Sequence, residues 1–276
     1  MGAPSSDGNN LVSSEEALKS SEGLGFERIV TIPGSTYKDN STIIIVPMRG
    51  ILIHSNDPVC KNGDHRYCKK PFAHQKVISS WMNLIAPMNQ KRMLMQIVGH
   101  EVGEAYNDAI RQILANPEWS KWKYIMTLED DNLPPPDAHI RLLESIEWAG
   151  FDAMSGLYFT KGDCGMPMAY GDPDEYRRTG NLDFRPRDVR AALQHGNIME
   201  VNGIAMGCAL WRLDLFRQVP PPWFVTVADV VPERGGAIAQ TQDLNFCEKG
   251  RRVGKKFGVD FRVRVGHLDL DSGVVY

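Results

Sequence analysis

The chain has 276 residues, a mass of 30.9 kDa and a formal net charge of −3 at pH 7. Its hydrophobic content of 42% and charged content of 24% are ordinary for a globular protein that buries a full core. With an isoelectric point near 6.2, nothing suggests the basic surface of a typical nucleic-acid-binding protein, so no nucleic-acid partner is evident. No apolar run approaches the roughly 18 residues of a transmembrane helix, and none is predicted.

Residues 1–38 are predicted to form a flexible polar tail, because they are rich in Ser and Gly and poor in hydrophobic residues. They lack the apolar core of a secretory signal. The chain also has five cysteines, an odd number, and they are scattered widely. Together these features favour reduced thiols and a cytoplasmic location.

Ordered structure is predicted to begin with a strand at 41–48, whose β-branched residues are typical of a buried parallel strand. Helices and strands then alternate: a helix at 77–84, a strand at 92–98, a helix at 102–114, a strand at 124–128, a helix at 138–149 ended by Gly150, and a strand at 153–159. This alternation predicts an α/β fold with a mostly parallel sheet and helices on both faces. Beyond it, a polar stretch at 160–200 precedes strands expected at 201–210 and 261–265.

Metal-ligand residue types occur in the segment that contains Cys60, His65, Cys68 and His74. Their spacing matches no standard zinc pattern, in which ligands are usually paired as C-x2-4-C and H-x3-5-H. We therefore interpret the segment as a loop with free thiols, and the sequence leaves metal binding by these residues open.

The most informative segment is the acidic triplet Glu129, Asp130 and Asp131, which follows the strand at 124–128 and precedes three prolines at 134–136. Adjacent carboxylates at a strand end repel each other unless a cation lies among them. A hard divalent ion, Mg²⁺ or Mn²⁺, prefers carboxylate and phosphate oxygens. The alternative is a solvated acidic turn, which binds nothing.

Three later segments bear on the triplet. Asp243 is expected in the first turn of a helix that Thr241 caps, where it either complements the helix dipole or acts as a general base in a cleft. His267 follows a glycine just beyond the last predicted strand, and such a histidine alone is usually packed or hydrogen-bonded. Gly203 and Gly207 permit either close approach of the backbone to a ligand or a tight bend.

The order of these motifs resembles that of the GT-A-fold nucleotide-sugar glycosyltransferases, in particular the family-2-like group with phage and bacterial members. The resemblance spans about residues 41–276 and rests on the segments 45–49, 103–109, 129–136, 206–212, 242–243 and 266–267. It implies a GT-A-type, Rossmann-like sheet flanked by helices, with a smaller antiparallel portion on the acceptor side. Within a single catalytic domain at 39–276, residues 39–160 would be the nucleotide-binding half and 161–276 the acceptor and catalytic half.

The resemblance also implies roles for the acidic residues and the late histidine. The triplet matches the Asp-x-Asp motif, with Glu129 in place of the first aspartate, so Glu129 and Asp130 are expected to contact the donor. Asp131 and His267 match the ligands of Mn²⁺ or Mg²⁺, and Asp243 matches the catalytic base of inverting members. The implied activity is transfer of a sugar from a nucleotide-sugar donor to a glycan or another hydroxyl acceptor.

Several weaker assignments accompany these roles. Pro47 and Met48 would border the nucleotide base, Asn107 would reach the donor, and Arg49 or Arg212 would pair with phosphate. The candidates for a sugar-stacking acceptor platform are the aromatic residues Tyr158, Trp211 and Trp223. The polar stretch at 161–196 would be a flexible lid over the donor.

Other functions fit the same residues. A retaining GT-A transferase or a nucleotidyltransferase uses the same metal and diphosphate chemistry, and a non-catalytic nucleotide-sugar or glycan-binding protein would need no base. A glycoside hydrolase with paired carboxylates is disfavoured by the metal-type triplet and the late histidine. The sequence does not determine the donor, the acceptor, the stereochemistry of transfer or the oligomeric state.

Overall fold

The computed structural model describes residues 39–48, 50–52, 69–71, 73–195, 198–231 and 236–276. Residues Asp39–Tyr276 form one compact unit. The tail expected at 1–38, Arg49, and the cysteines and histidine at positions 60, 65 and 68 lie outside the described residues. His74 is described, and its side chain caps helix α3 (Gln75–Met82) by accepting the Lys76 N–H at 3.2 Å.

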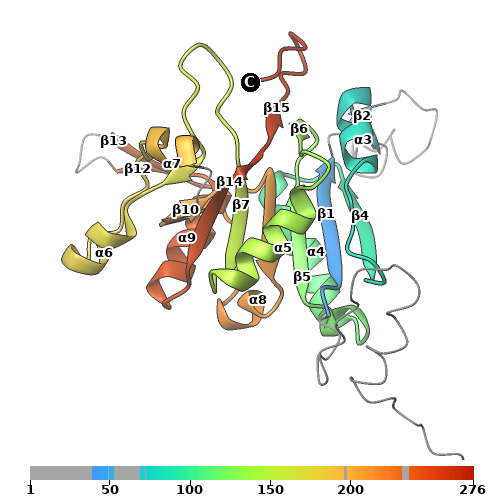
Figure 1. The fold of residues 1–276 in the computed structure, drawn as a ribbon, viewed down its shortest axis with the longest axis horizontal. Coiled ribbons are helices and arrows are strands. Elements are labelled where there is room, and N and C mark those ends of the chain that lie inside the picture. Colours follow the sequence, from blue (N-terminus) through green and yellow to red (C-terminus); the bar gives the residue numbers. More distant parts are fainter. Residues whose placement is uncertain (1–38, 49, 53–68, 72, 196–197, 232–235) are drawn as a thin grey trace, which may run out of the picture. The chain divides into compact units, whose positions relative to one another are not determined.

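A seven-stranded sheet forms the centre of this unit (Figure 1). Its strands lie in the order β4 (Arg92–Val98), β1 (Thr42–Met48), β5 (Tyr124–Leu128), β11 (Cys208–Arg212), β7 (Ala153–Leu157), β14 (Phe257–Arg264) and β9 (Ile198–Val201). Strand β1 pairs in parallel with both β4 and β5, and β7 pairs in parallel with β14. Only β11 and β9 run antiparallel to their neighbours in the sheet, so the predicted mostly parallel sheet is confirmed.

Strand β1 shows why the sheet forms in this way. All of its residues are buried, and successive side chains point to opposite faces of the sheet. Ile43 and Ile45 pack into one hydrophobic core, while Ile44 and Val46 pack into a second. A strand covered on both faces requires a continuous apolar sequence, which is what this segment provides.

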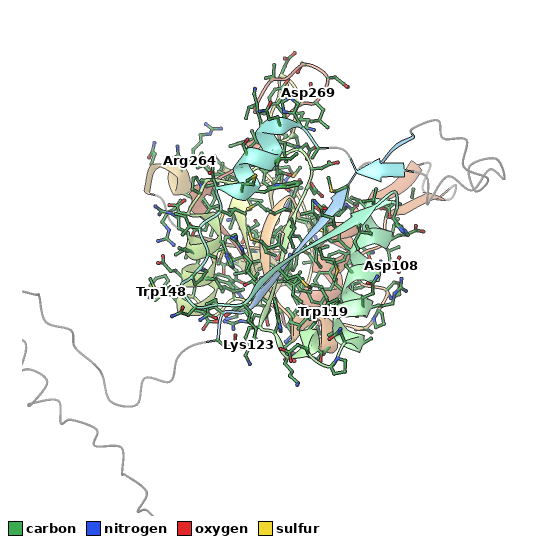
Figure 2. The ribbon with its side chains drawn as sticks, turned by 90° about the vertical axis from the view of Figure 1, so that its right-hand side faces the viewer. Asp108, Trp119, Lys123, Trp148, Arg264 and Asp269 are labelled. Carbon is green, nitrogen blue, oxygen red and sulfur yellow. The ribbon has the colours of Figure 1, made fainter. Side chains whose placement is uncertain are left out.

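Helices cover both faces of the sheet, as the alternating pattern predicts. The first core includes residues of α4 (Val102–Ala115), α8 (Leu215–Gln218) and α9 (Gln242–Arg252). The second core includes residues of α5 (Ala138–Trp148), and Trp81 of α3 packs against it. On the outside lie exposed side chains such as Lys123, Trp148 and Arg264 (Figure 2).

Four pairs of short strands form separate two-stranded sheets in the described part of the chain. They are β2 (Gly50–Leu52) with β3 (Lys69–Pro71), β6 (Asn132–Leu133) with β15 (Gly266–His267), β8 (Ala169–Tyr170) with β10 (Gly203–Ile204), and β12 (Val227–Val231) with β13 (Gly236–Gln240). A 3₁₀ turn at Trp119–Lys121 precedes β5. No helix in the described part of the chain is long and apolar enough to cross a membrane.

Two sequence predictions need correction. The single strand expected at 201–210 is instead divided among β9, β10 and β11, because Asn202 leaves the sheet to bond the Tyr170 carbonyl at 2.7 Å. The stretch expected to be an unstructured lid contains β8, α6 (Pro173–Thr179) and α7 (Arg190–His195). Helix α6 has its own cap, since the Asp172 carboxylate accepts the Asp174 N–H at 2.9 Å.

Candidate functional site

The acidic triplet lies at the carboxyl end of β5, at the edge of the sheet where β1 and β4 also end. The Glu129 N–H donates to the Gly207 carbonyl at 3.2 Å, just before the antiparallel strand β11 begins. The Asn132 N–H then donates to the Glu129 carbonyl at 3.1 Å, which closes a turn. The three carboxylates are therefore presented by a hydrogen-bonded turn at the edge where α/β sheets bind ligands.

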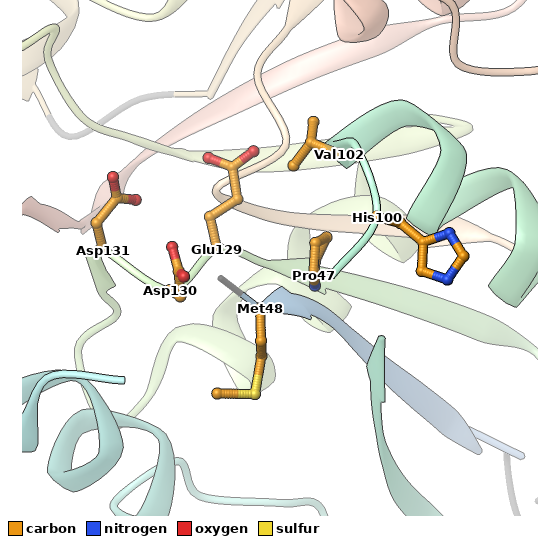
Figure 3. A pocket seen from close by; sticks show the side chains of 7 residues that line it. All are labelled: Pro47, Met48, His100, Val102, Glu129, Asp130 and Asp131. Atoms are coloured by element: carbon orange, nitrogen blue, oxygen red, sulfur yellow. The ribbon is translucent and has the colours of Figure 1, made fainter. Parts of the chain in front are cut away.

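A cavity of about 250 Å³ opens beside this turn (Figure 3). Its lining consists of the three carboxylates together with Pro47, Met48, His100 and Val102. Pro47 and Met48 end β1, whereas Val102 begins α4, so three segments converge here. The predicted contacts of Pro47 and Met48 stay predictions, but both residues border the cavity. His100 was not anticipated from the sequence.

His267 reaches the triplet through backbone pairing. Strand β15 pairs antiparallel with β6, which places His267 opposite Asn132, and the Leu268 N–H donates to the Asp131 carbonyl at 2.7 Å. As a result, Nε2 of His267 lies 3.7 Å from Oδ2 of Asp131. The structure thus brings together the two residues that were proposed as metal ligands.

The tautomer of His267 follows from its other ring nitrogen. Nδ1 lies 2.7 Å from the carbonyl oxygen of Phe159, which can only accept a hydrogen bond, so Nδ1 carries a proton. In the neutral ring Nε2 then keeps its lone pair and faces Asp131. A histidine that donates from one nitrogen and presents the other is arranged as metal ligands usually are.

Lys161 also contacts Asp131, a contact that sequence reasoning missed. Its Nζ lies 2.6 Å from Asp131 Oδ2. Burial acts to raise the pKa of Asp131, but the contact with His267 and the hydrogen bond from Lys161 outweigh it and lower this pKa to about 2. The Asp131 carboxylate is therefore ionised at any physiological pH and is already paired with a cation.

Glu129 has the opposite tendency. Burial raises its pKa to about 8, and the negative charges of Asp131 and Asp243 act in the same direction. Near neutral pH Glu129 therefore mostly retains its proton. A protonated carboxyl donates one hydrogen bond, whereas an ionised one only accepts, so Glu129 can act as a hydrogen-bond donor near neutral pH.

Asp243 lies in the first turn of α9, after Thr241 at the N-cap position. Its Oδ1 accepts hydrogen bonds from the Thr241 hydroxyl and from the Leu244 N–H, the latter at 2.8 Å. Burial raises the pKa of Asp243 above that of an exposed aspartate. Its charge also contributes to the raised pKa of Glu129 and, after burial, to that of Tyr170, so Asp243 lies near the triplet.

The residues fit a divalent ion in part. The described part of the chain contains no group of three His, Cys, Asp or Glu side chains placed to hold a metal. Asp131 and His267 nevertheless offer one oxygen and one nitrogen at a shared position, and Mn²⁺ accepts both atom types. The Lys161 ammonium marks that position as one where a cation is stabilised. A metal bound there would complete its coordination with substrate oxygens and water.

Two predicted donor contacts need correction. Asn107 is buried within the fold, where its Nδ2 donates to the Phe224 carbonyl at 2.6 Å and its Oδ1 accepts the Trp223 N–H at 2.9 Å. Arg212 lies at the opposite end of β5, where it donates to the carbonyls of Phe151 and Ile146. Both side chains stabilise the fold and are not offered to a ligand.

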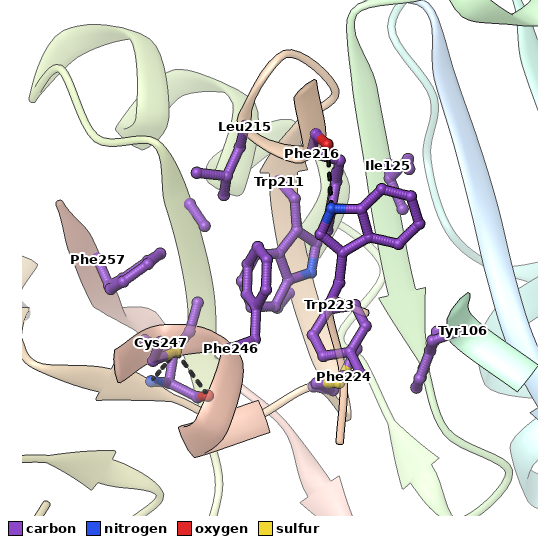
Figure 4. Close-up of a cluster of buried hydrophobic side chains, with 14 of the residues drawn as sticks. Tyr106, Ile125, Trp211, Leu215, Phe216, Trp223, Phe224, Phe246, Cys247 and Phe257 are labelled. Carbon is purple, nitrogen blue, oxygen red and sulfur yellow. Dashed lines mark hydrogen bonds between the residues drawn. The ribbon is translucent and has the colours of Figure 1, made fainter. Parts of the chain in front are cut away.

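The aromatic acceptor platform is also corrected. Trp211 has no exposed surface and packs among Phe216, Phe224 and Phe246, with Nε1 donating to the Thr127 hydroxyl at 3.0 Å (Figure 4). Trp223 is 5% exposed and its Nε1 donates to the carbonyls of Phe216 and Val219. Neither ring can stack on a sugar, because packing in the core covers both.

Tyr158 is buried as well, although it touches the site. Its hydroxyl accepts the Gly207 N–H at 2.7 Å, and its ring lies edge-on to His267. A Cβ added to Gly207 would lie 2.2 Å from Oδ1 of Asn132 and 2.6 Å from this hydroxyl, so the close packing requires glycine. Gly207 therefore allows close packing around the site, and the Tyr158 ring packs against the imidazole of His267.

Comparison with known proteins yields a likeness of fold. No protein-family model and no curated protein sequence matches the chain. Among solved structures, the crystal structure of A197 from STIV is similar, with a TM-score of 0.51 and 13% sequence identity over 83% of this chain and 86% of that chain. At this identity the similarity shows the fold alone: a mixed α/β domain with a mostly parallel central sheet flanked by helices.

Proposed function

We propose that the protein is a metal-dependent glycosyltransferase with a GT-A-type fold, which transfers a sugar from a nucleotide-sugar donor to an acceptor hydroxyl. The observation that carries this proposal is the approach of Asp131 Oδ2 and His267 Nε2 to 3.7 Å beside the cavity at the sheet edge. The placement at the carboxyl ends of parallel strands supports nucleotide binding, because ligands of open α/β sheets bind there.

Charge explains why such a site needs a cation. Three carboxyl groups line its cavity, namely Glu129, Asp130 and Asp131, and Asp243 is close enough for its charge to act on Glu129. A nucleotide diphosphate would be repelled by those of these groups that are ionised, such as Asp131, unless positive charge lies between. Mn²⁺ or Mg²⁺ held by Asp131 and His267 would stabilise the negative charge that develops on the leaving diphosphate.

Asp243 is the proposed general base of an inverting reaction. The Thr241 hydroxyl and the Leu244 N–H both hold Oδ1, so we assign Oδ2 to the acceptor proton. The raised pKa brings Asp243 closer to the operating pH, which makes it a stronger base than an exposed aspartate. Removal of the proton during attack turns the acceptor hydroxyl into an effective nucleophile.

Glu129 is proposed to bind the donor as a hydrogen-bond donor. With a pKa of about 8 its carboxyl is mostly protonated at neutral pH, so it can donate to a sugar or ribose oxygen without adding a negative charge beside the diphosphate. Pro47 and Met48 provide an apolar wall on the other side of the cavity, suited to the flat face of a base.

The test is a thermal-shift panel of UDP-, GDP-, TDP- and CMP-sugars with Mn²⁺, followed by product analysis. A ligand that binds the folded state raises its melting temperature, so the donor class should stand out. Transfer or hydrolysis of that donor should stop when EDTA is added, and NMR of the product should show inversion. Retention would overturn the role of Asp243, and donor binding without metal-dependent turnover would favour a non-catalytic nucleotide-sugar-binding protein.

A further inference from the structure

Lys161 contacts one acidic side chain of the site and lies near two other acidic side chains. Its Nζ lies 2.6 Å from Asp131 Oδ2, and its side chain is 29% exposed. Its positive charge also lowers the pKa of Asp269 and opposes the rise in the pKa of Glu129. Lys161 is therefore a resident cation at the position where the proposed metal would bind.

The loop that carries Lys161 has a fixed base. It follows β7, rises beyond the carboxyl edge of the sheet (Figure 1), and is closed by a bridge between Phe159 and Pro167. The Thr160 N–H donates to the Met166 carbonyl at 2.9 Å, and the Met166 N–H donates to the Thr160 hydroxyl at 2.9 Å. The tip at 162–166 is exposed. The Lys161 side chain can therefore turn to a new partner without breaking the base of the loop.

A divalent ion and this ammonium group compete for the same carboxylate oxygen. Both would approach Oδ2 of Asp131, where the Lys161 Nζ already lies at hydrogen-bond distance. Two cations so close together repel each other strongly in a partly buried site. When the metal binds, Lys161 must therefore leave, and the nearest new negative charge is the diphosphate that the metal brings with it.

We propose that Lys161 is a diphosphate-binding residue that pairs with Asp131 while the site lacks a metal and moves to the donor's phosphates once a divalent ion occupies Asp131. This inference rests on the proposed function. Lysine is suited to the role, because its ammonium is a compact point charge on a flexible stem and binds phosphate in that way. The exchange keeps the charge of the carboxylate compensated both before and after metal binding.

The proposal predicts two opposite changes in one variant. Lys161→Met retains the length of the stem and removes the charge, so the competitor of the metal is lost and Mn²⁺ affinity should rise about fivefold. Inorganic pyrophosphate should bind the Mn²⁺-loaded variant at least about tenfold more weakly than it binds the Mn²⁺-loaded wild type, because one charged hydrogen bond is missing. Lys161→Arg keeps the charge and should retain pyrophosphate binding.

The experiment uses the full chain and two titrations. Electron paramagnetic resonance of free Mn²⁺ gives the metal affinity, and calorimetry with inorganic pyrophosphate on the Mn²⁺-saturated protein gives the anion affinity. Lys121→Met is the matched control, since Lys121 is exposed in the turn before β5 and should change neither value. Melting curves verify that each variant is folded.

The possible results separate the two proposals. Absence of Mn²⁺ binding in the wild-type protein would overturn the metal-dependent function, and this inference with it. Normal wild-type binding together with unchanged Mn²⁺ affinity in Lys161→Met would overturn the competition alone. A rise in Mn²⁺ affinity with unchanged pyrophosphate affinity would reduce Lys161 to a counter-ion and overturn its role in binding the diphosphate.

Discussion

The ring of Tyr158 lies edge-on to the imidazole of His267, with 5.4 Å between ring centroids, while its hydroxyl accepts the Gly207 N–H at 2.7 Å. One buried side chain thus joins the end of β7 to both β15 and the start of β11. The Phe159 carbonyl, which orients His267, follows directly in the chain. The position of the imidazole therefore depends on Tyr158 as well as on strand pairing.

Tyr158→Phe should remove the hydrogen bond with Gly207 without leaving a cavity in the core. The ring remains, but the buried Gly207 N–H loses its acceptor, which costs about 1–3 kcal/mol in the free energy of unfolding. Urea denaturation measures that loss, and Tyr176→Phe serves as a control, because the half-buried Tyr176 ring lies beside Arg251. Equal stability of the two variants would show that the Gly207 contact contributes little.

Asp131→Asn should abolish Mn²⁺ binding in the micromolar range. The amide keeps the shape of the side chain but removes the charge that a hard cation requires. Asp214→Asn, on the surface at the start of α8, should leave Mn²⁺ affinity unchanged. Titration of both variants with Mn²⁺ makes the comparison, and full retention of binding by Asp131→Asn would place the metal elsewhere.

Asp243→Asn should separate binding from chemistry. If Asp243 is the general base as proposed, its loss lowers kcat by roughly 10²–10⁴-fold, whereas affinity for the donor should change little because the proposed role concerns the acceptor hydroxyl alone. The readouts are steady-state rates and donor affinity measured on the same preparation. A variant that loses donor affinity but keeps kcat would assign Asp243 to donor binding.

His139 makes stability depend on pH. It is 1% exposed, with Nε2 3.0 Å from the Thr42 hydroxyl, and burial followed by the charge of Arg92 lowers its pKa to about 4. Between about pH 6.5 and 4 the unfolded chain binds a proton that the folded chain does not, so stability falls as the pH decreases.

The slope from this group should approach 1.4 kcal/mol per pH unit and should be missing in His139→Gln. Urea denaturation of both proteins from pH 7 to pH 4 measures the difference in slope, which cancels the contributions of other titrating groups. Parallel curves for the two proteins would mean that the pKa of His139 is the same in the folded and the unfolded chain.

Periodicity made much of the scaffold predictable. Strands β4 and β5 begin and end at the residues where the apolar runs do, and α4 starts at the predicted Val102. These elements are long enough for the period of their apolar residues to decide their type. The break at Asn202 was missed, because a tertiary hydrogen bond to Tyr170 outweighs the local preference for a strand.

The site was less predictable than the scaffold. Asp131 and His267 meet because two-residue strands pair, and such strands are too short to show a period. Lys161 lies in a polar stretch where no pattern distinguishes one charged residue from another. Trp211 is an aromatic residue of the type that stacks on sugars. Only its packing against Phe216 and Phe246 shows that it belongs to the core.

The backbone carbonyl and the side-chain carboxylate of Asp131 have different partners. Its carbonyl accepts the Leu268 N–H at 2.7 Å, while its carboxylate faces Lys161 and His267. A ligand that holds the Asp131 carboxylate in place therefore also stabilises the hydrogen bond between the Leu268 N–H and the Asp131 carbonyl. By the same linkage, a stable hydrogen bond at this position favours binding of the ligand. Occupancy of the site should be visible as slower hydrogen exchange at the Leu268 amide, a local reporter that requires neither a known donor nor a known acceptor.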